Sequence, residues 1–180
     1  MNLRVGAYAN YFMAVPVNET LSFNVALKMS VDREETCNET LCWVSSMTTE
    51  FILDHNTTKM VFTWWLSKDK LVPLLLRMQT YMNDTLLVQQ DIYPQQAPPE
   101  AGEPPQPIDP QSIVGYETIM VPAGMFANCA KSEVKTVQEG HTVVTDTWIH
   151  PDVPVFGIVK MEMYRDGKLY TRIELTSYGG

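Results

Sequence analysis

Two cysteines and four asparagines in the first half of the chain are the residues whose types and spacing point most directly to chemistry. Cys37 and Cys42 form a C-x4-C segment, which is short enough for a disulfide across a turn, and two reduced, buried thiols are the alternative. The asparagines stand in N-x-S/T sequons, the acceptor sequence for N-glycosylation of secreted proteins. They are Asn18, Asn38, Asn56 and Asn83. Threonine-rich strands beside turn asparagines would produce the same pattern.

Disulfides and N-glycans both belong to oxidising, extracellular compartments. We therefore predict a secreted or cell-surface protein, exported with a leader that is then removed. The longest apolar stretch, 71–76, contains a proline and is far too short to cross a bilayer. A membrane-spanning segment is not expected.

The patterns typical of catalysis or of a metal site do not occur in this sequence. His55, His141 and His150 are far apart, and neither a C-x-x-C pair nor an acidic calcium loop is present. The G-x-S-x-G elbow of serine hydrolases and a glycine-rich phosphate loop are missing as well. With 21 acidic and 13 basic residues the net charge is −8, so no basic stripe is available for a nucleic-acid backbone. We expect a non-catalytic protein without cofactor, metal or nucleic-acid partner.

Soft apolar side chains are abundant instead. The chain has eleven methionines and an adjacent tryptophan pair, Trp64 and Trp65, and methionine is over-used on adaptable binding surfaces. Adjacent residues of a strand point to opposite faces, so one tryptophan could lie on the outer surface or line a cavity. An ordinary core with scattered exposed aromatics is the alternative to a curved sheet around an apolar pocket.

Alternation of apolar and polar residues with a period of two predicts β-strands. The pattern is clearest in the last hairpin, where Val159, Met161 and Met163 alternate with polar residues. A two-residue Asp-Gly loop would pair apolar residues of one strand with polar residues of the other. We therefore predict a three-residue loop at 165–167. The partners expected opposite the three apolar residues are Ile173, Thr171 and Leu169.

The rest of the chain divides at a proline-rich tract. Seven of the twelve prolines lie in 91–111, which predicts an extended connector or loop between a 1–90 half and a 112–180 half of one domain. The apolar spacing over 68–76, with Pro73 in the first turn, favours a short amphipathic helix. Strands are expected at 6–17, 21–31, 41–51, 59–65, 80–90, 114–121, 125–137, 141–149, 155–165 and 168–177.

Several segments carry a family resemblance. They are Leu3–Tyr11, Val121–Phe126, Trp148, Val153–Lys160 and Glu174–Gly179. Together they resemble secreted prokaryotic proteins, archaeal and thermophilic ones included, that look related to the LolA/LolB-like lipoprotein-carrier half-barrels. The resemblance implies a mainly β (α+β) fold, in which a strongly curved antiparallel sheet, a half-barrel, has one or two helices packed on its concave face.

In those carriers the concave face holds acyl chains, so the resemblance implies a lipid or the acyl chain of a lipoprotein as partner. No ligand-binding motif of the carriers transfers to this sequence, so we select the candidate ligand-binding residues by apolar alternation. For each of them, a role in the hydrophobic core is the alternative. They are Trp64, Trp65, Met161, Met163, Ile173 and Leu175. A structural or adhesive surface glycoprotein with a filled core is the alternative function.

Overall fold

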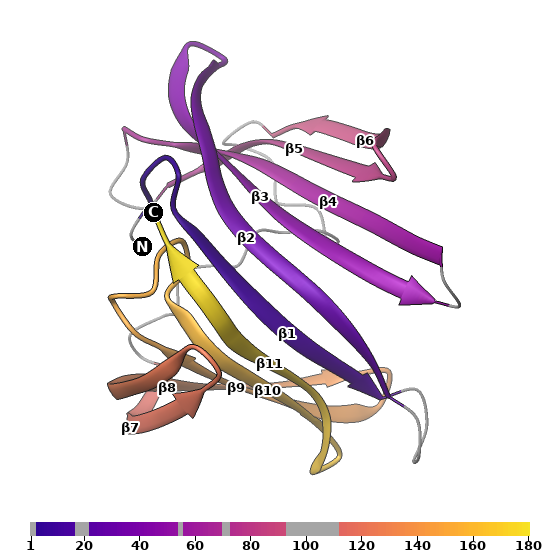
Figure 1. Cartoon of the computed structure of the whole chain (residues 1–180), viewed down its shortest axis with the longest axis vertical. Helices are drawn as coiled ribbons and strands as arrows, with labels where there is room; N and C mark the ends of the chain where they lie inside the picture. The colour runs from indigo at the N-terminus through magenta and orange to yellow at the C-terminus, as the bar shows by residue number, and fades with distance from the viewer. Residues whose placement is uncertain (1–2, 17–21, 54–55, 70–72, 93–111) are drawn as a thin grey trace.

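Eleven strands of one antiparallel sheet make up the fold (Figure 1). The structure is a computed structural model in which residues 3–16, 22–53, 56–69, 73–92 and 112–180 are described. The strands are β1 (Tyr8–Pro16), β2 (Ser22–Cys37), β3 (Thr40–Leu53), β4 (Asn56–Ser67), β5 (Leu75–Met82), β6 (Thr85–Asp91), β7 (Ile113–Val121), β8 (Gly124–Gln138), β9 (His141–Ile149), β10 (Ile158–Arg165) and β11 (Lys168–Gly179). Their order across the sheet is β6-β5-β4-β3-β2-β1-β11-β10-β9-β8-β7.

The first and last strands join two meanders. β1 pairs with β2 on one side and with β11 on the other, both antiparallel. β6 and β7, which follow each other in the sequence, form the two edges of an open sheet. The proline-rich connector predicted between them lies outside the described residues from residue 93 onward.

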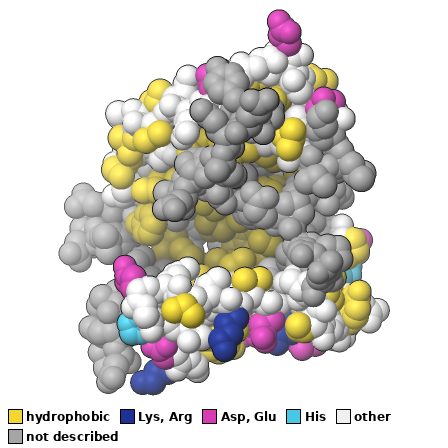
Figure 2. Space-filling view, turned by 180° about the vertical axis from the view of Figure 1, so that it is seen from behind, with side chains coloured by type: hydrophobic (Ala, Val, Ile, Leu, Met, Phe, Trp, Pro, Cys, Tyr) yellow, Lys and Arg dark blue, Asp and Glu magenta, His cyan; other side chains and the backbone are white. Residues whose placement is uncertain are grey.

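The sheet curves strongly, and its inner face is apolar. One cluster of buried residues unites Leu27 and Met29 of β2 with Ile119 of β7 and Phe126 of β8. Because these strands are far apart in the sheet order, their side chains meet only on the inside of the curve. Figure 2, seen from behind, shows hydrophobic side chains gathered in a hollow between the two parts of the sheet. The prediction of a mainly β chain is confirmed.

The predicted helices are wrong for the part of the chain that the structure describes, where no α-helix occurs. In the segment 68–76, residues 70–72 lie outside the described residues, and Leu75 already belongs to β5. A bulge between β4 and β5 lies at this point, where Leu66 pairs with Leu75 and Trp65 with Arg77. Leu76 and Met78 are both buried but in different clusters, so the apolar spacing departs from a period of two and imitates a helix.

One strand prediction and one turn prediction are also wrong. The single strand expected at 80–90 is a hairpin, with Asn83 and Asp84 between β5 and β6. The last hairpin has a two-residue Asp166-Gly167 turn, since Arg165 pairs with Lys168. Both turns have positive φ at both central residues, the geometry of a type I′ turn. A bulge next to Met163 returns the apolar residues of the two strands to the same face. The register therefore differs from the predicted one.

Candidate ligand-binding site

The two tryptophans point to opposite faces of the sheet, as expected for adjacent strand residues. Trp64 is 1% exposed and lies in a buried cluster with Met78. Leu3 and Met47 pack against both this cluster and the main one, so Trp64 belongs to the inner face. Trp65 belongs to a separate cluster. The structure therefore does not bring Trp65 together with the other predicted site residues.

The predicted residues of the last hairpin divide into core and partly accessible positions. Leu175 is fully buried. Met161 and Ile173 are direct partners across β10 and β11, and both pack, partly buried, against the main cluster. Met163, opposite Thr171, is also partly buried. Met161, Met163 and Ile173 thus keep accessible surface that a ligand can contact, while Leu175 and Trp64 serve as packing.

A groove of about 620 Å³ opens at the β7 edge, and none of the six predicted site residues lines it. Its floor runs across three strands, because Tyr116 of β7 pairs with Ala130 of β8, which pairs with Ile149 of β9. Ile149 is on the same side of β9 as Thr147, the partner of Met161, so the groove and Met161 share one face of the sheet. The described residues that line it are Tyr116, Asn128, Ala130, Ile149, His150, Pro151, Val153, Phe156 and Gly157.

The wall of the groove is the loop between β9 and β10. Its ends meet where the His150 amide donates to the Gly157 carbonyl at 2.8 Å. Val153 and Val155 are almost fully buried in the main cluster, which anchors the loop from below. Val155 has φ 67°, a strained conformation for a β-branched residue, and such strain persists only where the surroundings fix it. The wall is therefore held in place before any ligand arrives.

Among the residues that the structure describes, no aspartate, glutamate, lysine or arginine lines the groove. Its polar groups are the imidazole of His150, the amide of Asn128 and the phenol of Tyr116. The His150 ring is already occupied on two sides, since Nδ1 accepts from the Asp152 amide at 3.2 Å and the Phe126 ring lies against it at 5.5 Å. A lining of this kind suits an uncharged, apolar group with few polar contacts.

A buried phenol fixes the strand beneath the groove. The Tyr11 hydroxyl of β1 donates to the Ile158 carbonyl at 3.1 Å, and Ile158 pairs with Ile149 of the groove floor. Burial raises the pKa of Tyr11, so this hydroxyl stays protonated and remains a donor throughout the physiological range.

The opposite face of the same strands carries ion pairs. Glu162 of β10 is buried and accepts from Lys160 at 2.9 Å, from Arg172 at 2.9 Å and from the Tyr164 hydroxyl at 2.8 Å. Burial alone would raise the pKa of Glu162, but the hydrogen bonds from Lys160 and Tyr164 outweigh it and the pKa is lowered. Its hydrogen-bonding capacity is used within the fold, in contrast to the open apolar face.

The Glu162 network predicts a pH-dependent loss of stability. Glu162→Gln is expected to lower the free energy of unfolding by about 1.5–3 kcal/mol at pH 7, because it removes the charge that three donors engage. A lowered folded-state pKa gives stability that is complete above the unfolded pKa and disappears as the pH falls through the folded pKa. The difference between wild type and variant should therefore shrink below about pH 4.3.

Urea denaturation followed by circular dichroism between pH 3 and pH 7 measures this difference. Glu133→Gln is the matched control, since Glu133 is an exposed glutamate on β8, and it should change stability by less than about 0.5 kcal/mol. A Glu162→Gln deficit that stays constant down to pH 3 would contradict the assigned role of the charge.

The two cysteines lie in the hairpin of β2 and β3. Cys37 and Cys42 are buried with free thiols, and burial raises the pKa of both. The register sets Cys37 opposite Thr40 and Cys42 opposite Glu35, so the thiols are diagonal neighbours. Diagonal Cα atoms are about 7–8 Å apart, and beyond ~7 Å a disulfide needs backbone movement. The disulfide stays a prediction that would require the hairpin to shift.

The sequon asparagines have a structural explanation as well as the predicted chemical one. Asn38 and Asn83 are exposed and stand first in two-residue turns, with φ 50° and 46°, a conformation that asparagine tolerates well. Asn83 also accepts a hydrogen bond from the Lys59 amide at 2.9 Å. Asn56 begins β4 and Asn18 lies outside the described residues. Glycosylation of the four sites stays a prediction.

In the described residues, no group of three or more histidine, cysteine, aspartate or glutamate side chains is arranged to hold a metal ion. His141 contacts Asp166 at 2.6 Å, His150 lies in the groove wall, and His55 is outside the described residues. The same part of the chain contains no helix of the length and hydropathy needed to cross a membrane.

Sequence reasoning missed the groove. The signal available was the Val153–Gly157 segment, because Pro154 and Gly157 are typical of a break between strands. The residues of the groove floor come from three separate strands, and no local sequence pattern predicts how these strands pair.

Comparisons with known proteins show the fold. No protein-family model and no curated protein matches the chain. Two similar solved structures, both 14% identical, are a candidate exported protein of Bacteroides fragilis with a YmcC-like fold and a candidate lipoprotein of Parabacteroides distasonis. The first has a TM-score of 0.49 and covers 100% of this chain and 98% of its own; the second has 0.51 and covers 99% and 97%. The chain therefore shares its fold with the Parabacteroides protein.

Proposed function

We propose that the chain is a non-catalytic, secreted or cell-surface protein that binds a hydrophobic ligand, a lipid or the acyl chain of a lipidated partner, on its curved sheet. The observation that carries this proposal is the groove of about 620 Å³ with its largely apolar lining. Typical small-molecule sites have about 300–1,000 Å³ and a mostly apolar lining with a few polar groups.

The surface next to the groove suits an acyl chain. Met161, Met163 and Ile173 are partly buried, and methionine adapts its shape to flexible apolar partners. Each methylene group that leaves water contributes about 0.8 kcal/mol, so a long chain gains affinity without a charged contact. This fits a groove whose described lining has no aspartate, glutamate, lysine or arginine.

The extracellular location rests on two further observations. The four sequons support it from the sequence. The similar structure from Parabacteroides distasonis is that of a candidate lipoprotein, and we extend this character to the present chain only as part of the proposal.

Tyr116→Asp tests the groove directly. The Tyr116 side chain is 69% exposed and lines the groove, so its replacement should leave folding intact. A carboxylate at the groove mouth is expected to raise the Kd for a fluorescent long-chain fatty acid analogue by about tenfold or more, because binding would have to desolvate the charge. Native mass spectrometry of protein purified without detergent should also lose a co-purifying lipid mass.

Val114→Asp is the matched control, because Val114 is equally accessible on the same edge strand but outside the groove lining. It should bind the probe like the wild type. The proposal fails if wild-type protein purifies without lipid and also stays free after incubation with fatty acids and phospholipids.

A structural or adhesive surface protein is the second candidate. The observation in its favour is the tight packing of Trp64 and Leu175, both at most 1% exposed, which resembles an ordinary filled core. A chain that remains free of lipid in the experiment above would support this candidate.

A further inference from the structure

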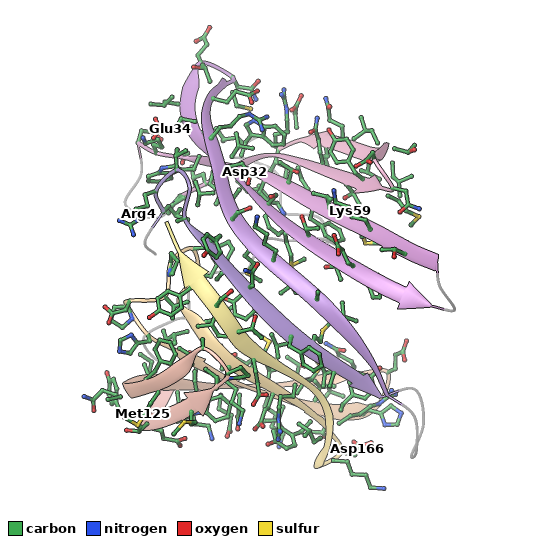
Figure 3. The ribbon with its side chains drawn as sticks, in the orientation of Figure 1. Arg4, Asp32, Glu34, Lys59, Met125 and Asp166 are labelled. Atoms are coloured by element: carbon green, nitrogen blue, oxygen red, sulfur yellow. The ribbon has the colours of Figure 1, made fainter. Side chains whose placement is uncertain are left out.

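A second hollow lies at the opposite end of the same strands. Its volume is about 310 Å³, and it opens between the β8–β9 turn and the β10–β11 turn. Figure 3 shows Asp166 at the tip of the second of these hairpins. The lining is Gln138, Glu139, Val143, Met163, Arg165 and Tyr170. In contrast to the groove, this hollow contains two charged side chains.

The bulge in the last hairpin supplies the aromatic ring of the hollow. Met163 pairs with Thr171 and Tyr164 pairs with Leu169, which leaves Tyr170 as the extra residue. Bulges redirect side chains and are over-represented next to functional sites. Tyr170 is 43% exposed, so its ring is available for contact in the hollow.

The two hairpins around the hollow are fastened to each other. The Asp166 amide donates to the Thr142 carbonyl at 2.8 Å, and the Thr142 amide donates to Asp166 Oδ1 at 3.0 Å. Asp166 Oδ2 contacts His141 Nδ1 at 2.6 Å, and this hydrogen bond, with a smaller contribution from the nearby charge of Arg165, lowers the pKa of Asp166. The hollow therefore has fixed walls, and the hydrogen bonds of Asp166 go to His141 and Thr142 and not to Arg165.

Arg165 and Glu139 are the charged groups left over. Neither forms an ion pair with any residue that the structure describes, although both line the same hollow. A cation and an anion that share a hollow without neutralising each other are complementary to a zwitterion. With a net charge of −8, the protein as a whole repels anionic ligands, which also favours a neutral zwitterion over an anion.

The hollow and the groove lie on one face of β9. Val143 lines the hollow and Ile149 lines the groove, and residues an even number apart share a face. Six residues of strand separate them by about 20 Å, a length that an extended long-chain acyl group can cover. Met163 and Met161, paired with Thr145 and Thr147, lie along this path.

We propose that the ligand is a zwitterionic phospholipid whose head group binds in this second hollow. Arg165 pairs with the phosphate, while Glu139 and the ring of Tyr170 contact the ammonium group by ion pairing and cation–π attraction. The acyl chain follows Met163 and Met161 toward the groove. This inference rests on the proposed function and adds the head-group class to it.

The test compares three single-chain lipids of equal chain length below their critical micelle concentrations: lysophosphatidylcholine, lysophosphatidic acid and monoacylglycerol. Wild-type protein is expected to bind lysophosphatidylcholine most tightly. Arg165→Gln should weaken that binding by about tenfold, the effect of losing one charge-assisted contact, and should change monoacylglycerol binding by less than twofold. Glu139→Gln should weaken lysophosphatidylcholine binding and improve lysophosphatidic acid binding.

Lys135→Gln and Glu133→Gln, both exposed on β8 and outside the hollow, are the charge-matched controls and should bind like the wild type. Equal affinity of wild-type protein for all three lipids, or a preference for lysophosphatidic acid, overturns the head-group inference and leaves the proposed function standing. An equal loss of lysophosphatidylcholine and monoacylglycerol binding in Arg165→Gln overturns it too. If none of the lipids binds, the proposed function falls and the inference with it.

Discussion

Replacing Trp64 with alanine is expected to lower the free energy of unfolding by about 3–5 kcal/mol, the range for large aromatic residues in a core. Trp64 is 1% exposed and packs with Leu66, Met78 and Ile92 on the inner face. Its ring also stacks on Phe62, with centroids 6.4 Å apart and an interplanar angle of 12°. The variant would lose these contacts and leave a cavity between β4 and β5. Urea denaturation followed by circular dichroism measures the change.

Phe12→Ala is the control for this experiment, because Phe12 of β1 is 41% exposed. It should cost much less than Trp64→Ala, since only partial burial is lost. Equal costs for the two variants would mean that Trp64 is not a packing residue, and its original assignment to the ligand site would regain support. A large cost only for Trp64→Ala places it in the core.

The final hairpin shows what alternation can and cannot predict. The apolar faces of β10 and β11 follow directly from a period of two, and Met161 and Ile173 do share a face. Their cross-strand partners were predicted two residues out of register, because we placed the extra residue of the hairpin in the loop and not in a strand. The structure has an even, two-residue turn and a bulge that leaves Tyr170 unpaired. Nothing in the local sequence distinguishes these two solutions.

The helix predicted at 68–76 failed for a similar physical reason. Leu76 packs against Trp65 in one cluster and Met78 packs near Trp64 in another. This part of the sheet is covered by apolar side chains on both faces, and the bulge at Leu76 breaks the strict alternation. Apolar spacing alone cannot separate such a strand from a helix.

The groove could not be predicted because it depends on pairing between distant segments. Tyr116, Ala130 and Ile149 become neighbours only when β7, β8 and β9 pair in the observed register. Local pattern instead selected the most apolar residues, and two of those, Trp64 and Leu175, are buried packing. Accessible ligand surface is found where apolar residues are incompletely covered, and coverage is a property of the tertiary structure.

Leu175→Ala is expected to lower the free energy of unfolding by about 2–5 kcal/mol. Leu175 is fully buried where several elements meet. It pairs with Tyr11 of β1, and its carbonyl accepts a hydrogen bond at 3.0 Å from Ala123 in the β7–β8 turn. The lost side chain would leave a cavity that the surrounding strands cannot easily fill. Chemical denaturation gives the stability change, and lipid affinity is measured under conditions where the variant remains folded.

Met161→Ala is the matched variant, because Met161 lies on the same face but is only partly buried. It should lose less stability than Leu175→Ala, while its affinity for a long-chain lipid falls in proportion to the contact removed. Folded Leu175→Ala should bind the lipid almost as well as the wild type. If Leu175→Ala loses more stability and Met161→Ala loses more lipid affinity, Leu175 belongs to the core and Met161 to the ligand surface. A Leu175→Ala variant that is stable but unable to bind would place Leu175 in the ligand site.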